Sequence, residues 1–375
     1  MLLALVFLIP VFQTASSVMV LLLVVASFFV SKRKGLDVVL HYGWDSFMYL
    51  LILLVGMLYT TDKVTGFHVI ETSLSLIAFP FIFRPIEGLN MIKRDALFYS
   101  LWAGLLSALV YCVGLAVFRY YHTSDIGEFF GEHLTSPLSN TLAVYFAYYL
   151  IFAITFGLYL LYVDQFEINK TILILALIFS FLMLLMMGSS TAIISILFSL
   201  LYFVLKFVFE GKRTNHNALA FGFSLCFLFS LFALNWSQPE FLGNDEYWER
   251  FILWESAVKA MPDWLVGIGT GDYTTVLNDY YRAHHLEKFA SDNFNPHNQY
   301  LETLFSNGLA GLIALLVMLC RPIYVAIRTQ NTLGFLCCFP FIVYGLTEVF
   351  LGRYQGVVFF GLLHQVFVVK LDDRK

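Results

Sequence analysis

The sequence predicts an all-α polytopic membrane protein, and its composition, its aromatic content and its apolar runs support this class. Apolar residues make up 59% and charged residues 13% of the 375 positions, whereas a soluble domain carries about 25% charged residues. Forty Phe and 21 Tyr are typical of a lipid-facing surface with aromatic residues at its interfaces. The small net charge of −4 argues against a nucleic-acid partner.

About twelve transmembrane helices are expected, because a helix needs roughly 17 to 25 mostly apolar residues to cross a bilayer. They are predicted near residues 2–14, 16–31, 43–60, 67–83, 96–118, 139–162, 168–187, 190–209, 217–234, 298–320, 333–350 and 354–370. The first two are short and meet near Pro10 and a polar stretch, and the count is eleven if they form one helix. No Lys or Arg precedes the first run, which argues against a cleaved signal peptide.

The predicted chain has three parts: transmembrane helices 1 to 9 (1–234), a long loop (235–297), and helices 10 to 12 with a short tail (298–375). One set of short connections holds fifteen Lys and Arg and the other set holds three. Short basic connections face the cytoplasm. Both termini are therefore expected in the cytoplasm and the long loop outside it.

The same topology places several polar features on the outer face of the membrane. They are the acidic loop 119–138, the small-residue corner 188–191, the long loop, and the connection from Glu348 to Gly356. Glu71 falls about one turn from that end of its span. An acidic residue in a membrane segment is costly, so Glu71 is either functional or paired with an arginine of this face.

Within the long loop, an amphipathic helix is expected to begin at Asn244 and to stop before Pro262. Its aromatic residues, Trp254 among them, recur at helical spacing, which predicts a helix that lies on the membrane surface. Arg250 sits in this helix. A surface arginine is usually a solvated charge, but its place beside an aromatic face favours the binding of an anion.

Gly267-Ile268-Gly269-Thr270-Gly271 lacks the Lys-Ser/Thr ending of a phosphate-binding loop, so a tight turn or a close backbone approach is expected. His284 and His285 are adjacent and point different ways, which argues against a metal site there. The five cysteines lie in apolar runs without ligand spacing and indicate small core residues. No metal ion or cofactor is expected.

The end of the long loop carries the strongest candidate. Asn295 is expected to cap the next helix, with Pro296 in the first helical position and His297 in the first turn. The positive end of the helix dipole would keep His297 neutral and able to accept a proton, and the unpaired N–H groups there can hold an anion. From the residues alone, a catalytic role and a structural hydrogen bond are equally supported for His297.

The order Arg250, Trp254, Gly267 to Gly271, and then Pro296-His297-Asn298-Gln299-Tyr300-Leu301-Glu302 resembles the bacterial O-antigen ligase and polymerase family. The tail with Leu346-Thr347-Glu348, Gln355-Gly356 and Phe359-Phe360 is similar as well, so the detailed likeness covers about the last 130 residues. One position departs from the family pattern. Ser190 stands where family members often have an arginine, and Arg353 is a candidate substitute for that arginine.

The resemblance implies a glycosyltransferase that moves a glycan from an undecaprenyl-pyrophosphate carrier to an acceptor hydroxyl. His297 would be the general base and Arg250 would hold the pyrophosphate, and both are the implied catalytic residues. The implied substrate-binding residues are Asn298, Arg353, Glu348, Trp254 and Ser190. The partners would be the lipid-linked donor, a lipid A core or glycan acceptor, and the bilayer itself.

Three alternatives remain open at this point. The acceptor is lipid A core in a ligase and another carrier-linked glycan in a polymerase, and we favour the ligase. A polysaccharide or small-molecule transporter is the main alternative of another class, since twelve spans are common in transporters. Against a transporter, no second half resembles the first and charges in mid-membrane are scarce. A membrane scaffold protein is a further alternative.

Overall fold

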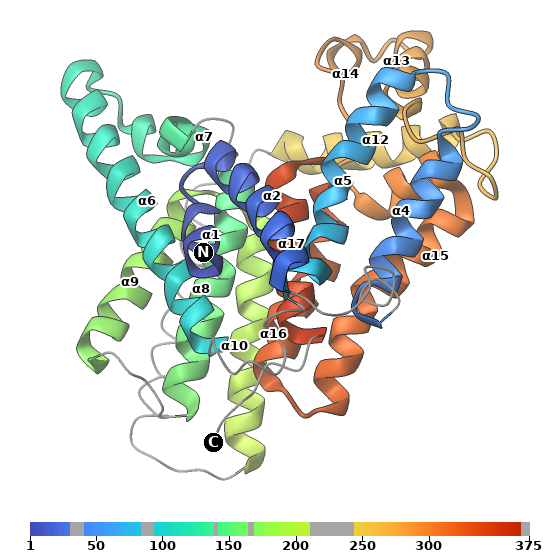
Figure 1. Ribbon diagram of the computed structural model, residues 1–375. Helices are drawn as coiled ribbons and strands as arrows, with labels where there is room; N and C mark the ends of the chain where they lie inside the picture. Colours follow the sequence, from blue (N-terminus) through green and yellow to red (C-terminus); the bar gives the residue numbers. More distant parts are fainter. Residues whose placement is uncertain (31–40, 84–93, 139–141, 164–168, 211–243, 369–375) are drawn as a thin grey trace. The chain divides into compact units, whose positions relative to one another are not determined.

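The computed structural model describes residues 1–30, 41–83, 94–138, 142–163, 169–210 and 244–368. Across these residues the regular secondary structure is helical, which confirms the predicted all-α class. The chain divides into two compact units (Figure 1). The first contains Ser16–Arg94 and Asp245–Lys375, and the second contains Leu2–Ala15 and Asp95–Asn244.

The helices of the first unit come from both ends of the chain. They are α2 (Gln13–Val30), α4 (Trp44–Gly56), α5 (Lys63–Phe83), α12 (Asn244–Ala260), α13 (Tyr273–Ala283), α14 (Glu287–Ser291), α15 (Gln299–Arg328), α16 (Thr332–Gly345), η4 (Phe350–Gly352) and α17 (Tyr354–Val368). The second unit is built from α1 (Leu2–Leu8), α6 (Arg94–Thr123), η2 (Ile126–Phe129), α7 (Gly131–Thr135), η3 (Ser136–Leu138), α8 (Ala143–Val163), α9 (Lys170–Met186) and α10 (Ser190–Glu210).

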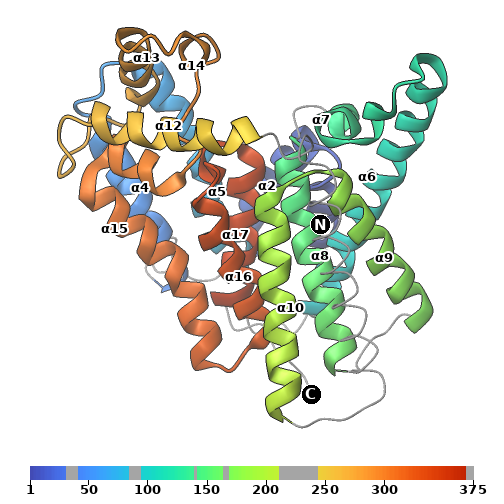
Figure 2. The same cartoon turned by 180° about the vertical axis from the view of Figure 1, so that it is seen from behind.

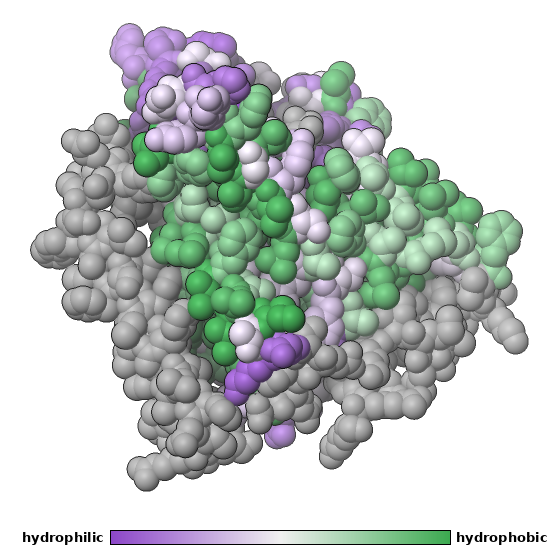
Figure 3. All heavy atoms as spheres, turned by 90° about the vertical axis from the view of Figure 1, so that its left-hand side faces the viewer, coloured by the Kyte–Doolittle hydropathy of each residue, from purple (hydrophilic) through white to green (hydrophobic). Residues whose placement is uncertain are grey.

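Four helices of the described chain, α5, α6, α8 and α15, are long and apolar enough to cross a membrane. Shorter apolar helices, α2, α4, α9, α10, α16 and α17, occupy other predicted spans. Figure 3 shows hydrophobic residues across the middle of one face, hydrophilic residues at its upper edge and a smaller hydrophilic group toward its lower edge. The predicted span 217–234 lies outside the described residues, so the count of twelve stays a prediction.

The predicted first span differs from the structure. Its helix, α1, has only seven residues, which rise about 10 Å against the roughly 30 Å of a bilayer core. The chain then turns at residues 9–12, around Pro10, before α2 begins. The first two runs therefore do not form one long helix, because proline cannot continue the hydrogen-bond ladder there.

In the second unit, α8 is buried along most of its length and contacts both α9 and α10. The connection 119–138 folds into the short helices η2, α7 and η3. Arg119 holds them in place, since its guanidinium donates to the Glu128 carboxylate at 2.6 Å and to the backbone oxygen of His133 at 2.6 Å. The acidic character of this connection is thus partly balanced by Arg119.

In the first unit, α15 packs against α4 and α16, and α5 packs against α17. Figure 2 shows α12 lying across the ends of these helices. The predicted loop helix is confirmed, since α12 begins at Asn244 and ends before Pro262. Its placement on the membrane surface stays a prediction. Leu253 and Ala257 pack into a core with α13, α14 and α15, whereas Phe251 and Val258 are both 59% exposed.

The glycine segment before α13 makes the expected close backbone approach. Ile268 and Gly269 donate their N–H groups to the backbone oxygens of Phe305 and Ser306, at 3.0 and 2.8 Å. Gly308 has a φ of +62°, and a Cβ on it would lie 2.2 Å from the Leu265 oxygen. Only glycine fits there. The loop is therefore fastened to α15 through its backbone.

A buried polar cluster that the sequence analysis missed joins α4, α15 and α17. The Asp45 carboxylate accepts from Arg321 Nη1 at 2.6 Å and pairs with His364 Nε2 at 2.7 Å. Gln365 donates to the Tyr42 backbone oxygen at 3.1 Å. Asp45 and His364 are almost wholly buried. Sequence could not reveal this cluster, because Asp45 lies 276 and 319 positions from its partners.

We expect Asp45→Ala to lower the stability of the first unit strongly. The substitution leaves Arg321 and His364 buried without their anion, and removing one partner of a buried pair costs about 3–5 kcal/mol. Thermal unfolding of the purified protein in detergent measures this. Asp279→Ala is the control, because Asp279 and Arg282 form an exposed pair on α13, worth about 1 kcal/mol or less. Equal unfolding temperatures for the two variants would contradict the prediction.

Candidate functional site

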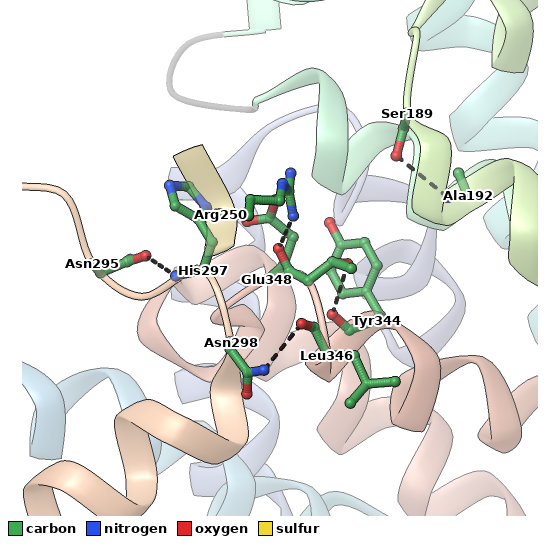
Figure 4. Close-up of polar contacts among 10 residues, drawn as sticks. Ser189, Ala192, Arg250, Asn295, His297, Asn298, Tyr344, Leu346 and Glu348 are labelled. Carbon is green, nitrogen blue, oxygen red and sulfur yellow. Dashed lines mark hydrogen bonds and ion pairs between the residues drawn. The ribbon is translucent and has the colours of Figure 1, made fainter. Parts of the chain in front are cut away.

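The candidate site forms where the turn before α15 meets the connection from α16 to η4. Asn298 joins the two segments (Figure 4). Its side-chain oxygen accepts the N–H groups of Tyr300 and Leu301, both at 3.0 Å. Its side-chain nitrogen donates to the Leu346 backbone oxygen at 3.1 Å. Asn298 thus caps α15 and holds the 346–349 segment against it.

The predicted helix start is therefore wrong by three residues. The cap is Asn298, with an extended backbone at φ −154° and ψ 111°, and α15 begins at Gln299. Asn295 instead accepts the His297 N–H at 2.8 Å, in a local turn that places His297 at φ +43°. His297 precedes the helix and is not in its first turn. The N–H groups of Tyr300 and Leu301, expected to be open to an anion, are used by Asn298.

Glu348 is the centre of the site. Its Oε2 lies 3.3 Å from His297 Nδ1, and its Oε1 lies 3.3 Å from Arg250 Nη2. Arg250 also donates to the Thr347 backbone oxygen at 2.5 Å. The exposed fraction of these side chains falls from 31% for His297 to 21% for Arg250 and 12% for Glu348. The carboxylate is thus the most enclosed of the three, and its two partners reach toward solvent.

This geometry defines the chemistry available to His297. An ionised carboxylate only accepts hydrogen bonds, so the contact with Glu348 places the proton of a neutral imidazole on Nδ1. Nε2 then carries the lone pair that can accept a proton. The arrangement of base and orienting carboxylate is the one that nucleophilic and acyl-transfer sites use to fix a histidine tautomer. The structure therefore brings together three residues that the sequence singled out separately.

Two other predicted residues lie in the same unit. Trp254 is partly buried on α12, and its indole N–H is buried without a hydrogen-bond partner in the described part of the chain. Arg353 follows η4, is exposed, and forms no ion pair with any residue that the structure describes. Their roles stay predictions. Ser190 is the first residue of α10 in the second unit, and its role is likewise a prediction.

Glu302 was not singled out by the sequence analysis. It lies in the first turn of α15, is 9% exposed, and its Oε2 has no hydrogen-bond partner among the described residues. Tyr273, at the start of α13, is close enough for its phenol pKa to be raised, first by the negative charge of Glu302 and then by burial. Arg353 acts on the same phenol in the opposite direction. An acid, a phenol and a cation thus lie close enough to interact with one another.

The remaining candidates have local roles in the structure. Glu71 is exposed, and its partner is His68 at 4.0 Å, not the expected arginine. His284 stacks on Tyr280 with ring centroids 3.9 Å apart, and His285 has a φ of +59° in the turn after α13. Within the described residues, no three His, Cys, Asp or Glu side chains are grouped as metal ligands would be.

The described residues form several apolar helices, four of them long enough to cross a bilayer, and this is the pattern of a multi-pass membrane protein. Residues 175–316 match the family model described as O-antigen ligase, so this segment of the chain is similar to that family. The matched segment includes Arg250, His297 and Asn298, whereas Glu348 and Arg353 lie beyond it.

A protein of Haemophilus influenzae, described as uncharacterized, is 28% identical to this chain over 137 residues. The alignment covers 34% of each chain. The chain thus spans about a third of that relative, and the likeness concerns a segment of both proteins.

We expect Asn298→Ala to destabilise the protein more than Asn295→Ala. Loss of a helix cap costs about 1 kcal/mol, and Asn298→Ala also breaks the hydrogen bond to Leu346. Asn295 supports only the local turn at His297. Comparison of unfolding temperatures in detergent measures the difference. A larger fall in unfolding temperature for Asn295→Ala would indicate that Asn295, as expected from the sequence, caps the helix.

Proposed function

We propose that this protein is a membrane glycosyltransferase acting at the periplasmic face of a bacterial inner membrane. It moves a glycan from an undecaprenyl-pyrophosphate carrier to an acceptor hydroxyl, and we favour an O-antigen ligase with lipid A core as acceptor. The observation that carries the proposal is the contact of Glu348 with both His297 and Arg250. The match of residues 175–316 to the O-antigen ligase family model supports the same chemistry.

In the proposed reaction, the acceptor oxygen attacks the anomeric carbon of the donor glycan. His297 accepts the hydroxyl proton at Nε2 while the new carbon–oxygen bond forms. The bond from that carbon to the pyrophosphate oxygen breaks, and the pyrophosphate leaves on its lipid carrier. Glu348 stabilises the imidazolium that results, since its carboxylate lies 3.3 Å from Nδ1.

The leaving pyrophosphate needs positive charge, and arginine supplies it with two parallel hydrogen bonds. The contact of the Arg250 guanidinium with the same carboxylate as the proposed base supports this role. Arg353 is the proposed second cation, in the role that Ser190 cannot fill. Its exposure, and the lack of an ion pair within the described chain, leave it available to an incoming anion. Two arginines make a metal ion unnecessary in this mechanism.

Asn298, Trp254 and Ser190 are proposed to help bind substrates. Asn298 would act by positioning the neighbouring segments, because its amide already holds α15 and Leu346 together. The buried, unpartnered indole N–H of Trp254 is a donor that a sugar or phosphate oxygen could satisfy. An O-antigen or capsular polysaccharide polymerase is the alternative, and it uses the same residues on a different acceptor. Gel analysis of surface glycans in a deletion strain separates the two: unmodified core indicates a ligase, and core with single repeats indicates a polymerase.

The decisive variant is His297→Ala, assayed for sugar transfer from a lipid-linked donor by the purified protein. Loss of a general base lowers the rate by about 10²–10⁴, so we expect near-complete loss in a folded, inserted protein. His284→Ala is the control, because His284 stacks on Tyr280 in α13. Transfer by His297→Ala at the wild-type rate would refute the catalytic role. Absence of transfer by the wild type, with transport of the donor instead, would favour a transporter.

Arg250→Ala should lose most of the transfer activity, since removing one side of a desolvated charge pair costs on the order of 2–5 kcal/mol. Arg250→Lys should restore only part of it, because lysine lacks the forked geometry of the guanidinium. Arg282→Ala is the control, since Arg282 forms an exposed pair on α13. The measurement is kcat/KM for the lipid-linked donor. Full activity of Arg250→Ala at normal expression would refute the assignment.

A further inference from the structure

A groove of about 600 Å³ runs between α2 and α5 in the first unit, with Tyr354 of α17 at one end. Pockets of about 300–1,000 Å³ are of the size that holds one small ligand. The lining of the groove changes from polar to apolar residues along its length. Glu71, the acidic membrane residue noted in the sequence, is one of its lining residues.

The polar part of the groove lies at the starting ends of the three helices. Ser17 of α2, together with His68 and Thr72 of α5, lines this end beside Tyr354. Ser16 and Tyr354 fasten it, with their hydroxyl oxygens 3.1 Å apart. The predicted topology places the starting ends of α2, α5 and α17 at the periplasmic face. The groove therefore opens with polar residues at the membrane surface.

The lining becomes apolar with depth. Val20 and Val24 of α2 face Ile77, Ala78 and Phe81 of α5 there. Below them, the rings of Phe28 and Phe81 meet with centroids 5.5 Å apart and close the gap between the two helices. From His68 to Phe81 the α5 backbone rises about 20 Å, against a hydrocarbon core of about 30 Å. The groove thus reaches well into the bilayer.

The mouth of the groove is adjacent in sequence to the candidate site. Tyr354 directly follows Arg353, and the same connection holds Glu348 with its partners His297 and Arg250. Charge is divided across the mouth: Glu71 puts a negative charge on the α5 side and Arg353 a positive one beside α17. An anionic head group is therefore drawn toward Arg353 and the site.

We infer that this groove binds the isoprenoid chain of the lipid-linked donor. The inference rests on the proposed function, which supplies a donor with a single long hydrocarbon chain and a pyrophosphate head. With the chain between α2 and α5, the head group passes Tyr354 and meets Arg353, and the first sugar lies toward His297. One chain fits a groove that Phe28 and Phe81 close, whereas the several acyl chains of a lipid A acceptor need a wider surface.

The test uses a polyprenyl diphosphate without sugar that carries a benzophenone on its first isoprene units. The full-length protein is held in nanodiscs of phosphatidylethanolamine and phosphatidylglycerol, irradiated, and mapped by mass spectrometry. We expect label in peptides that cover 17–24 of α2 and 68–81 of α5. Excess unlabelled polyprenyl diphosphate should remove the label, whereas the same excess of lipid A or phosphatidylglycerol should not.

Val24→Trp and Val25→Trp form the matched pair of variants. Val24 lines the groove, whereas Val25 is its neighbour on α2, 48% exposed and outside the lining. An indole in the groove should lower labelling and raise the KM for a long-chain donor about tenfold, equivalent to about 1.4 kcal/mol. Val25→Trp should leave both unchanged, because tryptophan is tolerated on a lipid-facing surface.

Labelling elsewhere, equal competition by phosphatidylglycerol or lipid A, or equal behaviour of the two variants would overturn the inference. Its failure differs from failure of the proposed function. If Val24→Trp still transfers sugar with a normal KM, the groove does not bind the donor chain, but the proposed transferase function stands. If the wild-type protein is labelled specifically but transfers no sugar, the proposed transferase function is wrong, but the groove is still a polyprenyl diphosphate site.

Discussion

The contacts of one carboxylate, that of Glu348, fix the geometry of the candidate site. A carboxylate enclosed to this extent is costly unless cations or donors surround it. Its two oxygens find them in His297 and Arg250, which come from the turn before α15 and from α12. Each carboxylate oxygen has its own partner. A shift of α12 or of the turn before α15 would therefore leave one oxygen of this enclosed carboxylate without its partner. The position of the base and the position of the arginine are thereby set by the same anion.

The bridge that Glu348 forms between His297 and Arg250 needs a rigid support. The backbone contacts between the long loop and α15 provide that support. Gly308 lets the backbone of Leu265 approach α15 so closely that no side chain fits between them. Leu253 and Ala257 lock α12 onto the same helix through a small apolar core. Asn298 then fastens the start of α15 to Leu346. Packing and hydrogen bonds thus hold the polar groups of the candidate site in place.

Sequence predicts this protein well where the signal is local. Apolar runs located the helices, and the interval from Asn244 to Pro262 located α12, because length, capping and proline act over a few residues. The start of α15 was misplaced because Asn295 and Asn298 can both cap, and the choice depends on the distant Leu346. The link from His297 to Glu348 crosses 51 positions. Hydrophobic periodicity carries no information about a contact between such distant residues. The sequence therefore identified both residues as candidates without predicting that they are in contact.

The bridge also couples the two halves of the proposed reaction. Without substrate, Arg250 is engaged by Glu348 and by the Thr347 backbone. When a pyrophosphate draws the guanidinium away, the carboxylate keeps His297 as its remaining partner in the bridge. An anion that loses one cation favours positive charge on its other neighbour more strongly. With the donor bound, the Glu348 carboxylate would therefore be available to stabilise the imidazolium that forms when His297 accepts the proton.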